Sequence, residues 1–338
     1  MKKFLARFDD WWFGHRSPVS LGLLRILLGT MAVIALSMTL LLFNDWYTPD
    51  GFVPRELSDR FLRYDSHVVW QNTPWEFHLP FGPPRLTLLP WGDNAAVTLG
   101  VYLLTLASAV AFTLGWRTRI AGVILIAGMV SIHTRTPFII HSGDSLLRLC
   151  LIYLVLSPSG AALSLDRRRE LRHKGLPPET PFTPVRVTGQ RLIQYQTALC
   201  YLATVWWKVF GTFWIDGTAT FYPSRMHEFS RFPVPEFLER QPFLGLTTYG
   251  TLIVEVALGT LFFWKPARKW VLISGLALHA YIEYRFNIPM FAFIITSTYI
   301  AFYEGEEVER WLAKRAWGRK LLGWGDVTAA PVAEPEPA

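Results

Sequence analysis

Lys208 is the residue of this sequence whose surroundings best suit proton chemistry. It closes an apolar run within "YLATVWWKVFGTFWIDG" (201–217), where Trp207 and Trp214 flank it. Apolar neighbours disfavour the charged form of a lysine, and a neutral amine is a general base, which an always-protonated arginine cannot be. The position equally suits an anchor at a membrane surface, where tryptophans form a belt and the lysine extends to water. Both interpretations stay open at this stage.

A second polar group ends one apolar run and begins the next, at 133–149. Asp144 and Arg148 are four residues apart, so they share one face of a helix. Asp144 also stands at the predicted start of that helix, where a carboxylate binds free backbone N–H groups. The pair is predicted to be either a helix cap with an internal ion pair or the charged rim of a cavity. His141, three residues before Asp144, would belong to the same rim.

Further ionisable residues lie inside apolar runs. Glu255 has no basic residue in its own run, so it must be protonated or paired with another helix. His279 and Glu283 are four residues apart, and the histidine either moves protons or satisfies a buried carboxylate. Arg25, near one end of its run, is expected to extend to the headgroups in a structural role. The sequence shows no metal-ligand spacing, so no metal is predicted.

Membrane helices are the elements that must position these residues. Of 338 residues, 51% are hydrophobic and only 17% are charged, with 15 Trp and 24 Phe. Long runs with almost no charge recur, which is typical of an all-α, polytopic integral membrane bundle. About eight transmembrane helices are predicted, near 20–43, 94–115, 119–137, 144–158, 190–209, 245–264, 269–285 and 288–303.

The positions of lysine and arginine indicate how these helices are oriented. Most of them lie in the N-terminal segment 1–19, in the loops after the second, fourth and sixth runs, and after the last run. Positively charged loops stay in the cytoplasm, so both termini are predicted to be cytoplasmic in a bacterial inner membrane. The net charge of +7 therefore indicates topology and contact with membrane lipids rather than nucleic-acid binding.

One membrane domain takes most of the chain. It spans residues 20–305, with external loops at 44–93 and 210–244 that are rich in Trp, Phe and Pro. These loops are expected either to cover the external end of the bundle or to be ordinary ordered loops. Residues 306–338 form a predicted cytoplasmic tail, disordered at its low-complexity end.

The predicted topology places the ionisable residues at a similar depth. The outer half of the membrane would contain Asp144, Arg148, Lys208, His279 and Glu283, with Glu255 near the middle. Because a charged residue in lipid is costly, an externally opening polar cavity is predicted among their helices. Chance clustering is the alternative, since helix ends tolerate charge. Two cysteines, Cys150 and Cys200, lie within apolar runs, so a structural disulfide is not expected.

Five short motifs resemble one membrane-protein family. In chain order they are "RILLG" at 25–29, "DGFVP" at 50–54, "HSGDSLLR" at 141–148, "LSPSGAALSLD" at 156–166 and "WKVFGTFWIDG" at 207–217. Their order and spacing resemble the HTTM domain over roughly residues 5–305. This membrane domain is shared by vitamin K-dependent gamma-carboxylase and many bacterial proteins.

The resemblance implies a role for Lys208. In the carboxylase, a lysine beside the last motif deprotonates vitamin K hydroquinone, and the oxygenated quinone then removes a glutamate γ-proton. One departure is that the carboxylase has a histidine where this chain has Gly143 and Asp144. Another is that the chain ends soon after the last run, without the external domain that holds a glutamyl substrate. Carboxylation of a protein is therefore not expected.

The leading hypothesis is a quinol-linked membrane enzyme, an epoxidase or carboxylase-like enzyme. Lys208 would be the general base, with Asp144, His279 and Glu255 orienting groups or relaying protons. A reduced quinone of the vitamin K or menaquinol type would contact Trp207, Trp214, Arg148 and His141. The alternative is a non-enzymatic accessory protein that holds a lipid, a quinone or a secreted peptide during maturation or export. A thiol-disulfide redox protein is a further possible partner.

Overall fold

The computed structural model describes the chain except for residues 1, 49, 55–56, 58–93, 227 and 325–338. The described residues are all-α, as predicted, apart from two short paired strands. Strand β1 (His15–Arg16) runs antiparallel to β2 (Val185–Arg186). Most of the predicted loop 44–93 and the end of the predicted tail lie outside the described residues.

Every apolar run forms a helix. The long helices are α2 (Val19–Leu40), α5 (Ala95–Leu114), α6 (Thr118–Arg135), α7 (Ser142–Val155), α9 (Thr188–Lys208), α11 (Phe243–Thr260), α12 (Lys265–Arg285) and α13 (Phe291–Ser297), which continues as the 3-10 helix η5 (Thr298–Phe302). In the described part of the chain, three stretches are long and apolar enough to cross a membrane: Val19–Leu40, Ala95–Leu114 and Phe243–Phe263. The last one joins α11 to η4 (Leu261–Phe263). The count of eight spans stays a prediction.

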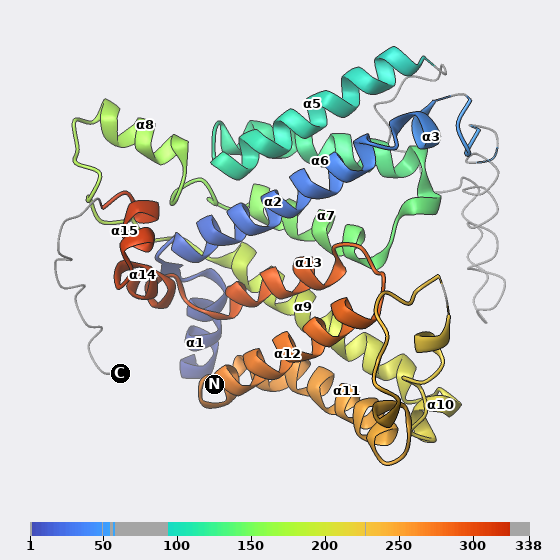
Figure 1. The fold of residues 1–338 in the computed structure, drawn as a ribbon. Helices are drawn as coiled ribbons and strands as arrows, with labels where there is room; N and C mark the ends of the chain where they lie inside the picture. Colours follow the sequence, from blue (N-terminus) through green and yellow to red (C-terminus); the bar gives the residue numbers. More distant parts are fainter. Residues whose placement is uncertain (1, 49, 55–56, 58–93, 227, 325–338) are drawn as a thin grey trace.

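Short helices gather at the two ends of the bundle (Figure 1). One end, here called the terminal end, carries α1 (Lys2–Phe13), α8 (Leu165–His173), α14 (Gly305–Ala313) and α15 (Ala316–Leu322). The opposite end, here called the loop end, carries α3 (Phe43–Tyr47) and α10 (Thr212–Ile215). Helices from both ends of the chain thus share the terminal end, which is the arrangement that the predicted orientation requires. The side of the membrane that each end faces stays a prediction.

Helix α2 lies at the centre of the bundle. It contacts α5 and α7 on one side and α13 and η5 on the other. Its buried face repeats at helical spacing through Leu21, Leu24, Leu28, Ala32 and Leu36. Figure 1 shows α5 and α6 beyond one side of α2, and α9, α11 and α12 beyond the other. Lipid tails are as apolar as these side chains, so close packing of the helices stabilises such a core within a membrane.

Glycines permit the closest helix contacts in this bundle. A Cβ added at Gly29 of α2 would lie 2.4 Å from Oγ1 of Thr113 in α5. One added at Gly128 of α6 would lie 1.9 Å from Oγ1 of Thr105 in α5. Small residues at helix contacts let backbones approach closely in membrane bundles. The glycine of the "RILLG" motif therefore has a packing role.

Arg25 is buried inside the bundle, which corrects the expectation that it extends to headgroups. Its side chain is fully buried, and its guanidinium donates to four backbone carbonyls. The acceptors are Ser159 O at 3.1 Å, Phe112 O at 2.7 Å, Thr113 O at 2.5 Å and Leu163 O at 2.5 Å. Two of these carbonyls end α5, where helix carbonyls lack intrahelical partners. Arg25 thus ties α2 to α5 and to the turn after α7.

Asp166 completes this arrangement, and we call the group the Arg25 junction (Arg25, Phe112, Thr113, Ser159, Leu163 and Asp166). The Asp166 carboxylate accepts from the backbone N–H of Arg117 and of Thr118, each at 2.8 Å, and from the Thr118 hydroxyl at 2.7 Å. Burial alone would raise the pKa of Asp166, but the hydrogen bonds from Thr118 and Arg117 and the charge of Arg25 outweigh it and lower that pKa. The carboxylate satisfies the N–H groups that begin α6.

The first part of the predicted tail, 306–322, folds back onto the bundle. Ser17 donates its backbone N–H to Glu306 and its hydroxyl to Glu309, each at 2.6 Å. Val308 and Leu312 of α14 are buried in a small core with Val19. The start of the segment is therefore ordered, because α14 buries an apolar face at the terminal end of the bundle.

The predicted external loop 210–244 is tied to the helices at the loop end. It contains α10, η2 (Pro223–Arg225) and η3 (Glu236–Glu239). Tyr249 of α11 donates its hydroxyl to Ile215 O at 2.6 Å, and Tyr284 of α12 donates to Pro233 O at 2.9 Å. These contacts hold the loop against α11 and α12, as expected of a loop that covers one end of the bundle.

Candidate functional site

One face of α9 supplies the core of the candidate site. Tyr201, Thr204 and Lys208 follow each other at spacings of three and four residues, so they lie on one side of the helix. This side faces α11, which carries Glu255. Lys208 is the last residue of α9, where a cation interacts favourably with the carbonyl end of the helix dipole.

Lys208 and Glu255 form an ion pair between two helices. Nζ of Lys208 lies 2.5 Å from Oε1 of Glu255, and the hydroxyl of Thr204 lies 3.4 Å from the other carboxylate oxygen. The Lys208 side chain is 23% exposed, whereas that of Glu255 is 8% exposed. Glu255 is thus paired with another helix, one of the two states the sequence allowed. The Lys208 side chain is therefore partly exposed, while its partner is buried.

A second hydrogen-bonded group begins one turn below Thr204, on the same helix face. The hydroxyl of Tyr201 lies 2.8 Å from Nε2 of His279 in α12 and 2.6 Å from the hydroxyl of Tyr299 in η5. All three side chains are buried. In the described part of the chain, Nδ1 of His279 has no hydrogen-bond partner. A buried polar atom without a partner is costly, so this nitrogen is available to a further proton donor or acceptor.

We call these two groups together the Lys208 site; its members are Tyr201, Thr204, Lys208, Glu255, His279 and Tyr299. Thr204 lies between the groups on α9: its hydroxyl lies 2.8 Å from the backbone carbonyl of Tyr201 and 3.4 Å from Glu255. The site therefore gathers an amine, a carboxylate, an imidazole and two phenols around neighbouring turns of α9. Such a set can accept, hold and pass protons.

Aromatic side chains border the exposed side of Lys208. Nζ of Lys208 lies 4.9 Å from the ring centre of Trp214, a cation–π distance. Trp206 and Trp207 are 62% and 76% exposed, and the Trp206 ring stacks edge-on with Phe210 at 5.1 Å. An exposed apolar surface of this kind marks contact with lipid, ligand or protein. Trp214 thus lies at the amine, whereas Trp207 points to the surroundings of the bundle.

Glu283 does not pair with His279, which corrects the expected i,i+4 pair. Its carboxylate forms an ion pair with Arg231 of the loop 210–244. The backbone of the same loop also joins α12, through Arg231 N to Arg285 O at 3.0 Å. Glu283 therefore fastens the loop to α12, while His279 turns toward Tyr201.

Asp144 and His141 form the start of α7. Asp144 accepts from the backbone N–H of His141 at 3.0 Å, and Nδ1 of His141 accepts from Gly143 N at 3.0 Å. This is a capping box, in which two residues satisfy each other's backbone donors. In the described structure no ion pair joins Asp144 to Arg148, so the expected internal pair is wrong and the helix cap is the arrangement found.

The site residues predicted from sequence therefore fall into two groups. Lys208, Glu255 and His279 belong to the Lys208 site, and Trp214 borders it. Across the described residues, no hydrogen bond or ion pair connects Asp144 to that site. One externally opening cavity that joins all these residues stays a prediction, as do the roles assigned to Arg148, His141 and Trp207.

Three members of the site, Tyr201, Thr204 and Tyr299, were not predicted from the sequence. Tyr201 and Thr204 carried a usable signal, because they precede Lys208 by seven and four residues and so share its helix face. Tyr299 carried none, since its position opposite Tyr201 depends on how the last helix packs against α9. A phenol in an apolar run is normally core, which is why these residues attract no attention in the sequence.

The family of this chain follows from a comparison with models of known protein families. A model of the HTTM domain matches residues 86–306, most of the chain. The chain belongs to the HTTM domain family. It therefore carries a gamma-carboxylase-like membrane domain, as its motifs suggested. The chain is also 24% identical over 228 residues to the uncharacterized protein YitO of Bacillus subtilis (strain 168), covering 64% of this chain and 71% of that protein. No solved structure matches it.

The motifs of this HTTM protein have different structural duties. Those at 141–148 and 156–166 cap α7 and build the Arg25 junction. The motif at 207–217 carries Lys208 and Trp214 of the candidate site. The motifs at 25–29 and 50–54 precede the matched range, and the first of them supplies Arg25 and Gly29 to the packing of the bundle. Of the five motifs, the last one contributes Lys208 to the candidate site.

Proposed function

We propose that this HTTM-domain protein is a quinol-linked membrane enzyme whose proton acceptor is the Lys208–Glu255 pair. The observation that carries the proposal is the 2.5 Å contact between the amine of a partly exposed lysine side chain and a buried carboxylate. The indole ring of Trp214 beside the same amine adds an apolar surface on which a flat ligand could lie. The family relationship supports the same chemistry by analogy.

The residues around Lys208 suit a reduced quinone. Trp214 offers an indole ring 4.9 Å from the amine, and neighbouring rings of Trp206 and Trp207 offer apolar surface to an isoprenoid tail. A bound quinol would supply the hydroxyl group that loses a proton and the electrons for reaction with oxygen. Apolar walls with a few convergent polar groups are typical of such small-molecule sites.

Lys208 and Glu255 can take up one proton beyond the one they already share. The pair shares a single proton. When the carboxyl of Glu255 holds that proton, the amine of Lys208 is neutral and its lone pair can accept a second one. A proton removed from a bound hydroxyl would leave an ammonium at Lys208 and a neutral carboxyl at Glu255. The ammonium would then face the oxygen that lost the proton and stabilise its negative charge.

Tyr201, His279 and Tyr299 would pass protons behind this pair. The Tyr201 hydroxyl lies between an imidazole nitrogen and a second phenol, so each hydrogen bond can reverse its direction. The free Nδ1 of His279 offers one further position for a proton. These residues are positioning and relay groups, whereas Lys208 is the group that meets the substrate.

The first test is a mass-spectrometric search for quinone epoxide. The protein in lipid would receive reduced vitamin K or menaquinol with oxygen and bicarbonate, alongside Lys208→Arg and Glu255→Gln. Lys208→Arg keeps a cation beside Glu255 but removes the base, so epoxide should fall at least a hundredfold. Lys269→Arg, on an exposed lysine at the start of α12, is the matched control and should retain activity.

A non-enzymatic accessory role is the second candidate. The exposed aromatic surface at Trp206, Trp207 and Phe210 favours it, because such a surface also suits a lipid or a secreted peptide. If folded, quinol-saturated protein forms no epoxide, and Lys208→Arg behaves as the parent in complementation, the enzyme proposal fails. A purified peptide bound with loss of affinity in Trp207→Ala would then support the accessory role.

The proposal includes placement in a bacterial inner membrane with the terminal end in the cytoplasm. The basic residues of α8 and of the segment after η5 support it, since positive segments stay inside. A reporter fused after residue 338 would be active if it requires the cytoplasm. One fused within the loop 210–244 would be active if it requires the periplasm.

A further inference from the structure

A cavity of about 450 Å³ lies between α8 and the end of α15. Figure 1 shows these two helices at the terminal end of the bundle, away from the end that carries α10. We call this cavity the α8–α15 pocket. One wall is a face of α8 with Arg167, Arg168, Leu171 and Arg172. The spacings of these residues from Arg167 are one, four and five, so they form one stripe along the helix. The other wall comes from Leu176 and from the end of α15.

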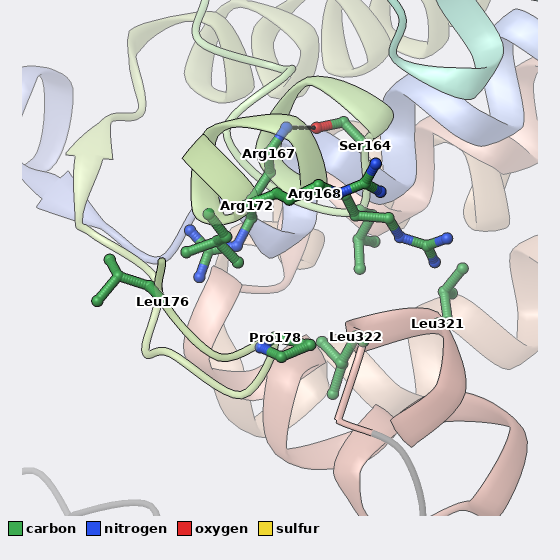
Figure 2. Close-up of a pocket in the computed structure, with 11 residues that line it drawn as sticks. Ser164, Arg167, Arg168, Arg172, Leu176, Pro178, Leu321 and Leu322 are labelled. Carbon is green, nitrogen blue, oxygen red and sulfur yellow. Dashed lines mark hydrogen bonds between the residues drawn. The ribbon is translucent and has the colours of Figure 1, made fainter. Parts of the chain in front are cut away.

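The pocket has a polar side and an apolar side. Figure 2 shows the arginine side chains of α8 on one side of the gap, with Leu321 and Leu322 of α15 across from them. Leu171 and Leu322 are buried and form apolar lining, whereas Leu176 is 43% exposed. A ligand that fits must therefore offer negative charge to α8 and apolar surface to the opposite wall.

The arginines of the pocket lack neutralising partners. In the described part of the chain, none of Arg167, Arg168 and Arg172 forms an ion pair with a carboxylate. Arg167 instead donates to the carbonyls of Thr180 and Pro181, at 2.5 and 3.2 Å, and its guanidinium lies 4.3 Å from the Phe182 ring. Arg167 is thus held in place with its charge intact, and like charges at neighbouring helix positions repel.

Nearby carboxylates are committed elsewhere. Glu170 pairs with Lys174 at 2.6 Å, and Glu309 accepts a hydrogen bond from the Ser17 hydroxyl. Burial raises the pKa of Glu309. An anion of another molecule is therefore the missing partner of the pocket.

We infer that the α8–α15 pocket binds the phosphate group of an anionic phospholipid, with the glycerol and first acyl carbons against its leucine wall. Guanidinium groups match phosphate oxygens in a two-pronged geometry. Basic pockets at the cytoplasmic ends of membrane helices suit anionic headgroups. The apolar wall distinguishes a lipid from free phosphate, because inorganic phosphate has nothing to place against leucine.

The test uses the full-length protein in detergent and measures binding of added phosphatidylglycerol by native mass spectrometry. Arg168→Gln/Arg172→Gln removes two charges from the pocket wall. One arginine near a membrane surface contributes about fivefold in lipid affinity, so the pair should weaken binding by roughly 25-fold. Arg169→Gln/Arg186→Gln removes two charges from exposed arginines outside the pocket, and should change binding less than about twofold.

Two further arms separate a lipid from a phosphate ion. Leu176→Ser should weaken phosphatidylglycerol binding by about fivefold, since it removes apolar wall without charge. Inorganic phosphate at the same concentration should not displace the lipid. Equal effects of the two double variants would overturn the inference by showing that the positive charge acts without a site. Displacement by equimolar phosphate, or no effect of Leu176→Ser, would overturn the lipid assignment.

Discussion

Arg25 and Lys208 are both cations within apolar helices, yet the structure surrounds them in opposite ways. Arg25 is fully buried and its guanidinium is occupied by four backbone carbonyls. Lys208 is 23% exposed and pairs with one buried carboxylate. Arg25 therefore donates its hydrogen bonds to the backbone of the protein. Lys208 donates to one carboxylate and keeps N–H donors for a ligand.

The difference shows how a membrane bundle separates structure from chemistry. Carbonyl acceptors at a helix end cannot take a proton, so they hold Arg25 in one state. A carboxylate can take a proton, so the Lys208–Glu255 pair has more than one state available. An ionisable residue inside a membrane is a functional candidate by default. Backbone carbonyl partners indicate a structural role for it, whereas a partner that can itself take a proton favours a functional one.

The largest effect is expected from removing Arg25. Arg25→Met would leave several buried carbonyls without donors, at a cost on the order of 4 kcal/mol in folding free energy. Arg25→Lys should recover only part of it, because three donors on one nitrogen cannot meet acceptors spread around a guanidinium. Thermal unfolding of the detergent-solubilised protein, with the monodisperse fraction on size-exclusion, measures both variants.

Lys208→Met is the comparison for that experiment. It should express and remain monodisperse, because it removes a single, partly exposed ion pair. Arg25→Met removes the donor of four hydrogen bonds. If Arg25→Met were as stable as the parent protein, the Arg25 junction would not be a structural element. The contrast between the two cations would then disappear.

The second prediction concerns the Lys208–Glu255 pair. Lys208→Met alone leaves a buried carboxylate without its cation, and should lower the unfolding free energy by about 2 kcal/mol. Adding Glu255→Leu should restore most of that loss, because the uncompensated group is gone. A double-mutant cycle on thermal unfolding measures the coupling. Additive losses in the cycle would mean that the two side chains do not interact.

The fold was largely predictable because its signals are local. Each apolar run became a helix, since length and hydrophobicity act within a segment. Caps followed the same logic: Asp144 stands at the start of α7, as a carboxylate at such a position should. The number of membrane spans was not settled this way, because α6, α7, α9, α12 and α13 are too short or too polar.

The site was only partly predictable because its contacts are not local. Lys208 and Glu255 were singled out individually, but the sequence could not show that they touch across 47 positions of chain. The expected local pairs failed for the same reason. Glu283 had a stronger partner in the loop arginine Arg231, and Asp144 had closer donors in the backbone. Spacing shows which residues share a face, but not which helix packs there.

The third prediction tests whether the second group of the Lys208 site is more than packing. Tyr201→Phe keeps the ring and removes the hydroxyl that joins His279 to Tyr299. Two buried polar groups lose a partner, so the unfolding free energy should fall by about 1.5 kcal/mol. Tyr102→Phe is a matched control, since that hydroxyl donates to Leu36 O away from the site.

Both tyrosine variants should lose stability, so a measurement of enzymatic activity is needed to distinguish them. If Tyr201 relays protons, any quinol epoxidation should fall about tenfold or more in Tyr201→Phe and stay unchanged in Tyr102→Phe. Equal activity in both variants would reduce the Tyr201–His279–Tyr299 group to packing. The comparison with Arg25 would then rest on the ion pair alone.

The smallest effect is expected at Asp166, where the Arg25 junction itself becomes sensitive to pH. Asp166→Asn replaces one acceptor oxygen with a donor that faces the N–H groups of Arg117 and Thr118, at a cost of about 1 kcal/mol.

The folded-state pKa of Asp166 lies below its ordinary value of 3.8. Its stabilisation is therefore complete above that value and is lost as the pH falls through the folded pKa. The difference in melting temperature between parent and variant should stay constant from pH 8 to about pH 5 and shrink toward pH 3. A difference that grew on acidification would mean that protonated Asp166 stabilises the Arg25 junction more than the carboxylate does. The junction would then change its protonation state, and Arg25 would no longer differ from Lys208 in this respect.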